Sequence, residues 1–193
     1  MIEGILDFLI RMVPGLLAGG TIFFLLRPVR MKALRNRELV SPRPREIVLF
    51  LFHLFCGGLA LLTLTPRWFH WITLLNAGHT GTHTFFQPGS FNLIPLQTFH
   101  IDPWSIMILL GNVIMFLPIG FVPLLLIPHL SIRKVLMISV LTPLCIEFWQ
   151  LLIGRAFDTD DLLLNAFGIL LGAFLCRVLL CKFTRLSGIF RVQ

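Results

Sequence analysis

The sequence predicts an all-α protein, a polytopic membrane bundle of about five transmembrane helices that forms one domain over residues 1–193. Hydrophobic residues make up 56% of the chain and charged residues only 13%, whereas roughly a quarter of the residues in a soluble domain are charged. Five apolar runs are each close to the ~20 residues that a helix needs to cross the hydrocarbon core of a bilayer. In chain order these runs are residues 5–26, 47–65, 105–127, 135–153 and 162–181.

A few polar or small residues interrupt these runs. Asp7 and Arg11 lie in the first run, where they can pair one turn apart or lie at the membrane interface. His53 is alone in the second run, and we expect it to be a buried histidine that hydrogen bonds within the protein. In the fifth run, the spacing of Gly168 and Gly172 favours close packing inside the bundle, and dimerisation stays open as the alternative.

Basic residues are distributed unequally over the connecting segments. Seven Lys and Arg residues lie in segment 27–46, two lie between the third and fourth runs, and more follow the fifth run. The alternate connections hold only Arg67 and Arg155. The positive-inside rule therefore predicts an outside N-terminus and a cytoplasmic C-terminus, with segment 66–104 outside. This pattern accounts for the net charge of +7 without nucleic-acid binding, and segment 27–46 could also bind anionic lipid head groups.

The long segment 66–104 is too apolar for a solvated loop. Its Trp and Phe residues predict a stretch that lies along the outer leaflet of the membrane. His79 and His83 have a four-residue spacing that suits a metal on a helix. Gly81 argues against a helix there, and no third ligand is evident, so we expect no metal site.

Polar residues from three helices and one loop gather near the predicted outer end of the bundle. Glu147 and Gln150 share one helix face because they are three residues apart. Polar groups are costly in hydrocarbon, so those that remain usually face a cavity or a partner. The sequence therefore predicts a polar pocket that opens outward. Its candidate ligand-binding residues are Asn112, Glu147, Gln150, Arg155, Asp158, Asp160, Asp161 and Asn165.

Each part of this set also has a simpler interpretation. Glu147 and Gln150 could form an interhelical hydrogen bond that only fixes packing. The three aspartates could bind Mg²⁺ or Ca²⁺, which take oxygen ligands. We instead expect Asp160 or Asp161 to cap the fifth helix, with Arg155 neutralising a neighbouring carboxylate. The sequence predicts no metal and no cofactor.

Two motifs resemble those of a known family. The first is Gly111-Asn112-x-x-x-Phe116-x-Pro118-x-Gly120-Phe121. The second is Ile146-Glu147-x-x-Gln150 followed by Arg155-x-x-Asp158-x-Asp160-Asp161-x-x-x-Asn165-x-x-Gly168-x-x-x-Gly172. Together with Phe91-Asn92-x-x-Pro95, they resemble the VanZ-like family over residues 91–172. The resemblance implies a bacterial multi-pass membrane protein and an association with resistance to glycopeptides, in particular lowered susceptibility to the lipid-tailed antibiotic teicoplanin.

Three classes of function follow as expectations. The first is a non-enzymatic protein of the cell membrane whose outward pocket binds a lipid-linked wall precursor or a lipoglycopeptide, with membrane lipids as its other partners. The second is an intramembrane enzyme, in which Glu147 is the acid or base and Asp158 or Asp160 its partner, with Arg155 as a phosphate clamp. The third is a transporter, which an odd number of helices without an inverted repeat makes less favourable.

Overall fold

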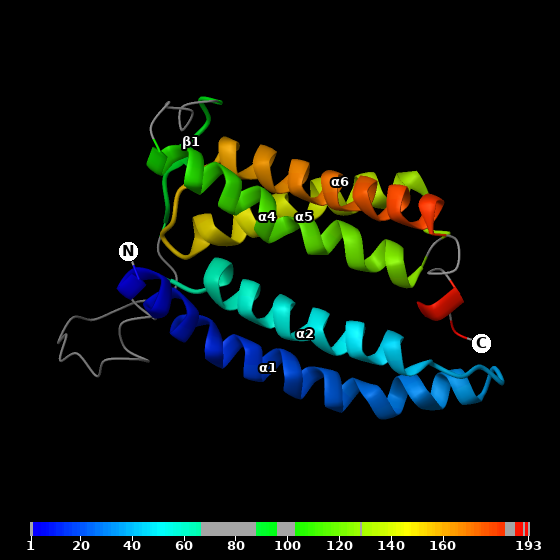
Figure 1. Ribbon diagram of the computed structural model, residues 1–193. Helices are drawn as coiled ribbons and strands as arrows, with labels where there is room; N and C mark the ends of the chain where they lie inside the picture. Colours follow the sequence, from blue (N-terminus) through cyan, green and yellow to red (C-terminus); the bar gives the residue numbers. More distant parts are fainter. Residues whose placement is uncertain are drawn as a thin grey trace.

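The computed structural model describes residues 2–66, 88–95, 103–127, 129–183, 188–190 and 192, without the side chains of residues 2–11 and 103–105. Within these residues, the chain forms five long helices and one pair of two-residue strands (Figure 1). The elements are α1 (Ile2–Arg35), α2 (Arg43–Leu64), β1 (Phe91–Asn92), α4 (Pro103–Leu126), α5 (Ile132–Leu152), β2 (Phe157–Asp158) and α6 (Thr159–Lys182). Each of the five helices contains a stretch long and apolar enough to cross a membrane. The prediction of an all-α bundle with five membrane-spanning helices is confirmed.

The first helix is longer than its apolar run. The run ends near Leu26, but α1 continues through Pro28 to Arg35. Hydropathy marks where a chain leaves the hydrocarbon, whereas Lys and Arg are themselves good helix formers. The predicted basic loop 27–46 is therefore mostly helical, and only residues 36–42 connect α1 to α2.

The helices form two groups. Figure 1 shows α1 and α2 as an antiparallel hairpin beside a second group made of α4, α5 and α6. Glycines bring the two backbones of the hairpin together. A Cβ on Gly19 would lie 2.1 Å from the carbonyl oxygen of His53, and one on Gly57 would lie 2.1 Å from that of Gly15. Small residues of this kind drive close helix packing in membranes.

The second group is built around an equally close approach of α4 and α6. A Cβ on Gly172 would lie 2.0 Å from the carbonyl oxygen of Leu117, and one on Gly168 would lie 2.5 Å from that of Val113. The prediction that these two glycines pack inside the bundle is confirmed. Around this contact lie fully buried side chains from both helices, namely Phe116, Leu124, Ile169 and Cys176.

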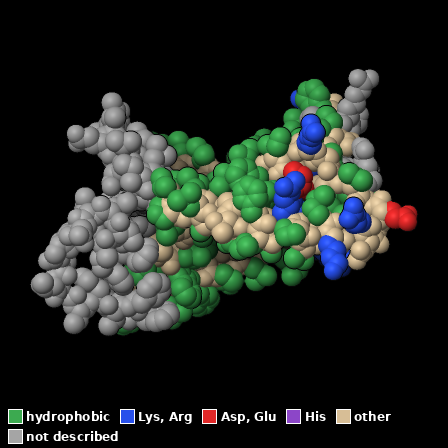
Figure 2. Space-filling model, turned by 90° about the horizontal axis from the view of Figure 1, so that it is seen from below, with side chains coloured by type: hydrophobic (Ala, Val, Ile, Leu, Met, Phe, Trp, Pro, Cys, Tyr) green, Lys and Arg blue, Asp and Glu red, His purple; other side chains and the backbone are tan. Residues whose placement is uncertain are grey.

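The outer surface of the bundle is apolar along its length. Large hydrophobic side chains on every described helix are exposed, including Leu17, Ile47, Ile114, Phe148 and Phe174. In Figure 2, hydrophobic side chains cover the middle of the molecule, and the Lys and Arg side chains in view lie toward one end. This is the surface expected of helices that pack against lipid.

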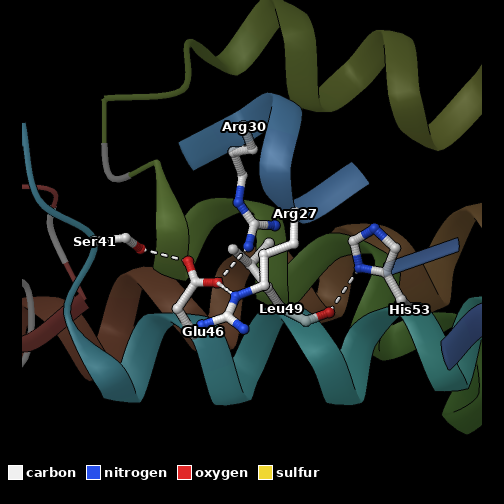
Figure 3. A network of polar contacts seen from close by, with 6 residues as sticks. All are labelled: Arg27, Arg30, Ser41, Glu46, Leu49 and His53. Carbon is white, nitrogen blue, oxygen red and sulfur yellow. Dashed lines mark hydrogen bonds and ion pairs between the residues drawn. The ribbon is translucent and has the colours of Figure 1, made fainter. Parts of the chain in front are cut away.

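Polar side chains join α1 to α2 at the end where the hairpin turns. Glu46 accepts hydrogen bonds from Arg30 and, at 2.6 Å, from the hydroxyl of Ser41 (Figure 3). The Nε of Arg27 lies 3.7 Å from the same carboxylate. Farther along α2, the Nδ1 of His53 lies 2.7 Å from the carbonyl oxygen of Leu49. The expected hydrogen bond of His53 within the protein is confirmed.

Candidate functional site

The candidate site lies at the other end of the bundle, where α2 ends and α6 begins, and we call this the site end (Figure 1). A short segment, residues 89–92, holds the loop between α5 and α6, and we call it the strap. The strand β1 pairs in parallel with β2, so that Asn92 lies beside Asp158. Gly89 donates its backbone N–H to the carbonyl oxygen of Leu151 at 2.8 Å. A Cβ on Gly89 would lie 1.9 Å from the carbonyl oxygen of Arg155, so only glycine fits against this loop.

Asp158 is the centre of the loop. Its side chain accepts hydrogen bonds from the backbone N–H of Asp160 at 2.8 Å and from the amide of Asn92 at 3.0 Å. Its own N–H donates to the carboxylate of Glu147 at 2.8 Å. These bonds join α5, the strap and the first turn of α6.

The expectation that Asp160 or Asp161 caps α6 is wrong, because Asp158 is the N-cap. A capping residue must be extended so that its side chain can reach the free N–H groups of the first turn. The strand pairing with Asn92 holds Asp158 in that conformation, at φ −115° and ψ 121°. Asp160 and Asp161 follow inside the first turn, where carboxylates interact favourably with the helix dipole.

An amide and a carboxylate link α4 to α6. The amide nitrogen of Asn112 donates to the carboxylate of Asp161 at 2.5 Å. Asn165 lies one turn after Asp161 on the same face of α6, and it is 5% exposed. Of the predicted polar group, Asn112 and Asp161 are in contact across two helices.

Gln150 and Arg155 contact α2. The Nη1 of Arg155 donates to the carbonyl oxygen of Leu62 at 3.1 Å, and the amide of Gln150 donates to that of Thr63 at 3.1 Å. Trp149, which lies outside the predicted set of site residues, donates its indole N–H to the carbonyl oxygen of Leu64 at 2.7 Å. The last carbonyl groups of a helix have no hydrogen-bond donors inside the helix. These three side chains supply the missing donors at the end of α2. A Trp at the end of an apolar run is a signal for such a role, because its N–H needs a partner when buried.

Two buried side-chain acceptor atoms in the described part of the chain have no hydrogen bond. They are Oε1 of Glu147 and Oδ1 of Asn165. The Glu147 side chain is 1% exposed, although its other oxygen bonds to the N–H of Asp158. The carboxylates of Asp158 and Asp161 repel that of Glu147, and the Arg155 guanidinium attracts it. The site is therefore buried, rich in acceptors and crowded with negative charge.

Some predictions fall outside what can be described. Most of segment 66–104 lies outside the described residues, as do His79 and His83. The side chains of Asp7 and Arg11 are likewise not described. Among the described residues, no three Asp, Glu, His or Cys side chains are grouped as a metal site requires.

The model of the VanZ/LLP1 family matches residues 48–180 of the chain. The chain belongs to this family. The matched region runs from α2 almost to the end of α6 and includes every residue of the candidate site. No curated protein and no solved structure matches the chain.

Asp158 offers a test of the local structure of this VanZ/LLP1 protein. We expect Asp158→Ala to destabilise the fold by about 1–2 kcal/mol, because it removes a helix cap and the bond to Asn92. Asp158→Asn should cost less, since its oxygen can still cap α6 and the amide of Asn92 can rotate to accept. Thermal unfolding in a mild detergent measures both changes. Equal unfolding temperatures for the two variants would contradict the assigned cap.

Proposed function

We propose that this VanZ/LLP1 protein is a multi-pass protein of the bacterial cell membrane whose site end faces outward. There it binds a lipid-linked or lipid-tailed molecule of the cell envelope, such as a wall precursor or a lipoglycopeptide, and so lowers susceptibility to teicoplanin. The observation that carries this proposal is the pair of buried acceptors left without a donor, Oε1 of Glu147 and Oδ1 of Asn165. Buried polar groups in native proteins normally have partners, and an exception calls for an explanation such as strain, a reactive role or a small molecule or ion that completes the site.

The charge distribution supports an outward site end. The opposite end holds the last turn of α1, the start of α5 and the end of α6. Basic residues gather on these segments, namely Arg30, Lys32, Arg35, Arg133, Lys134 and Lys182. The side of a membrane protein that carries such an excess is usually cytoplasmic.

Cysteine labelling tests this orientation. In a variant whose native cysteines are replaced by alanine, Ala156→Cys places a thiol at the site end and Ser131→Cys places one at the opposite end. Both positions are exposed. We expect a membrane-impermeant maleimide added to intact cells to label the first thiol and not the second. Labelling of Ser131→Cys alone would reverse the topology.

The binding proposal is tested in a teicoplanin-sensitive bacterium that produces the full chain. We expect the parent to raise the inhibitory concentration of teicoplanin more than that of a glycopeptide without an acyl tail. Glu147→Gln should abolish the protection, because it replaces the unpartnered acceptor of the site. Ser139→Ala is the matched control, since Ser139 is buried on the same helix but bonds only to the helix carbonyl of Leu136. If Glu147→Gln protects as fully as the parent at equal protein levels, the site takes no part in the protection.

The intramembrane-enzyme alternative has less support. It needs Arg155 as a phosphate clamp, but this side chain donates to the last carbonyls of α2. It also needs Asp158 or Asp160 as a reactive carboxylate, and both oxygens of Asp158 accept hydrogen bonds from the chain itself. A binding function uses the same site without these requirements.

A further inference from the structure

Three amide side chains of the site donate their hydrogen bonds to other groups of the protein. The amides of Asn92 and Asn112 donate to the carboxylates of Asp158 and Asp161. Gln150 donates to the end of α2. The two buried side-chain atoms of the site that lack a hydrogen bond are both acceptors, so a ligand that donates N–H or O–H groups would complete them.

These two acceptors are deeply buried. The side chain of Glu147 is 1% exposed and that of Asn165 is 5% exposed. A buried acceptor without a donor costs roughly 1–3 kcal/mol, and a ligand that supplies N–H or O–H groups recovers this free energy. A phosphate or carboxylate ligand brings further acceptors and leaves the cost in place. At the site end, Asn112 and Asp161 are half-buried.

The charge of the site favours a cation among possible donors. A charge on Glu147 is disfavoured by burial and is repelled by the carboxylates of Asp161 and Asp158, whereas Arg155 attracts it. Asp161 is in turn repelled by Asp158 and, more weakly, by Asp160, and it is attracted by Arg155. Negative charges that are buried together are stabilised by a cation that also forms hydrogen bonds.

We propose that the site recognises a primary ammonium group on the head of its lipid-linked or lipid-tailed ligand, with Glu147 and Asn165 accepting its N–H groups. This inference rests on the proposed function, because it specifies what the same site binds. An ammonium supplies three N–H donors and a positive charge, which suits buried acceptors that lie among carboxylates.

Three amphiphiles with the same twelve-carbon tail provide the test, using the full chain in detergent. Dodecylamine carries a charged group with donors, dodecyltrimethylammonium carries the charge without donors, and dodecyl phosphate carries a negative head. We expect dodecylamine to bind about tenfold or more tightly than either of the others, as the loss of a charge-assisted hydrogen bond implies. Microscale thermophoresis measures the dissociation constants.

Glu147→Gln sharpens the test. The glutamine oxygen can still accept from the N–H of Asp158, while its NH₂ group replaces the free acceptor with a donor. We expect this variant to lose dodecylamine binding about tenfold or more, by the same reasoning, and Ser139→Ala to retain it. Asn165→Ala is the second variant, which removes the other free acceptor and which also serves if Glu147→Gln does not elute as a folded species.

The outcomes separate this inference from the proposed function. Tighter binding of dodecylamine that depends on Glu147 or Asn165 supports the ammonium site. If dodecyl phosphate or dodecyltrimethylammonium binds as tightly and depends on the same residues, the ammonium inference fails while a ligand site remains. If binding of all three amphiphiles is unaffected by both substitutions, the ligand site itself is absent, and the proposed function fails with it.

Discussion

Gly120→Ala is expected to prevent stable packing of α4 against α6. A Cβ at this position would lie 1.8 Å from the carbonyl oxygen of Ile169 and 2.9 Å from the backbone nitrogen of Ala173. Both atoms belong to the backbone of α6, so no side chain can rotate away to make room. Overpacking of a core usually costs 1–3 kcal/mol, and we expect about 3 kcal/mol or more here because two helices must separate. Thermal unfolding and gel filtration in mild detergent measure the effect.

Gly111→Ala is the matched control, because it makes the same change on the same helix. Among the described residues, and apart from the adjoining backbone of α4, no heavy atom lies within 4 Å of a Cβ at Gly111. Alanine is the better helix former by about 1 kcal/mol, so this variant should be as stable as the parent or more so. Parental stability of Gly120→Ala would mean that α4 and α6 do not approach as closely as described.

The same glycines show which parts of the fold the sequence can predict. The number of spanning helices follows from the thickness of a bilayer, and the small residues Gly168 and Gly172 indicate a packing face. The helix that packs against this face cannot be predicted, because an apolar surface such as that of α4 could pack against any of the other helices. Nor does hydropathy locate the end of α1, since the helix continues to Arg35 after the apolar run stops.

Within the site, the sequence predicts which side chains lie near one another when they share a helix face or lie at the same depth in the membrane. Asp161 and Asn165 share a face of α6 by spacing, and Asn112 contacts Asp161 from the same depth in α4. The sequence does not predict a contact when a side chain hydrogen bonds to the backbone of another helix. The last carbonyls of α2 have no side-chain pattern, so the contacts of Gln150 and Arg155 with them could not be expected.

The strap was also beyond prediction. Two-residue strands are too short to show an alternating pattern, and the pairing of Asn92 with Asp158 joins segments far apart in the sequence. That pairing decides which aspartate caps α6. The identity of the cap depends on the first helical residue, which sequence patterns locate only to within a residue or two.

Arg155→Met is expected to loosen the hairpin of α1 and α2 from the other three helices. At the site end, Arg155 donates to the carbonyl oxygens of Leu62 and Thr63, at 3.1 and 3.5 Å, while Trp149 donates to Leu64. Methionine keeps the apolar stem but leaves the carbonyl of Leu62 without this donor. Loss of a charged donor to a partly buried acceptor costs about 2–3 kcal/mol. Thermal unfolding in detergent measures the change, and Arg177→Met on the exposed face of α6 is the matched control.

A double-mutant cycle distinguishes the loss of these specific hydrogen bonds to the end of α2 from a general loss of packing. If Trp149 and Arg155 hold the same end of α2, then Trp149→Phe should cost less in the presence of Arg155→Met than alone, because the helix end is already released. Sites that do not share partners add to within about 0.5 kcal/mol, so pairing Arg155→Met with Ser139→Ala should give a simple sum. Additivity in both pairs would show that the two donors act independently. Each donor would then add its own increment to the docking of the hairpin, whether or not the other is present.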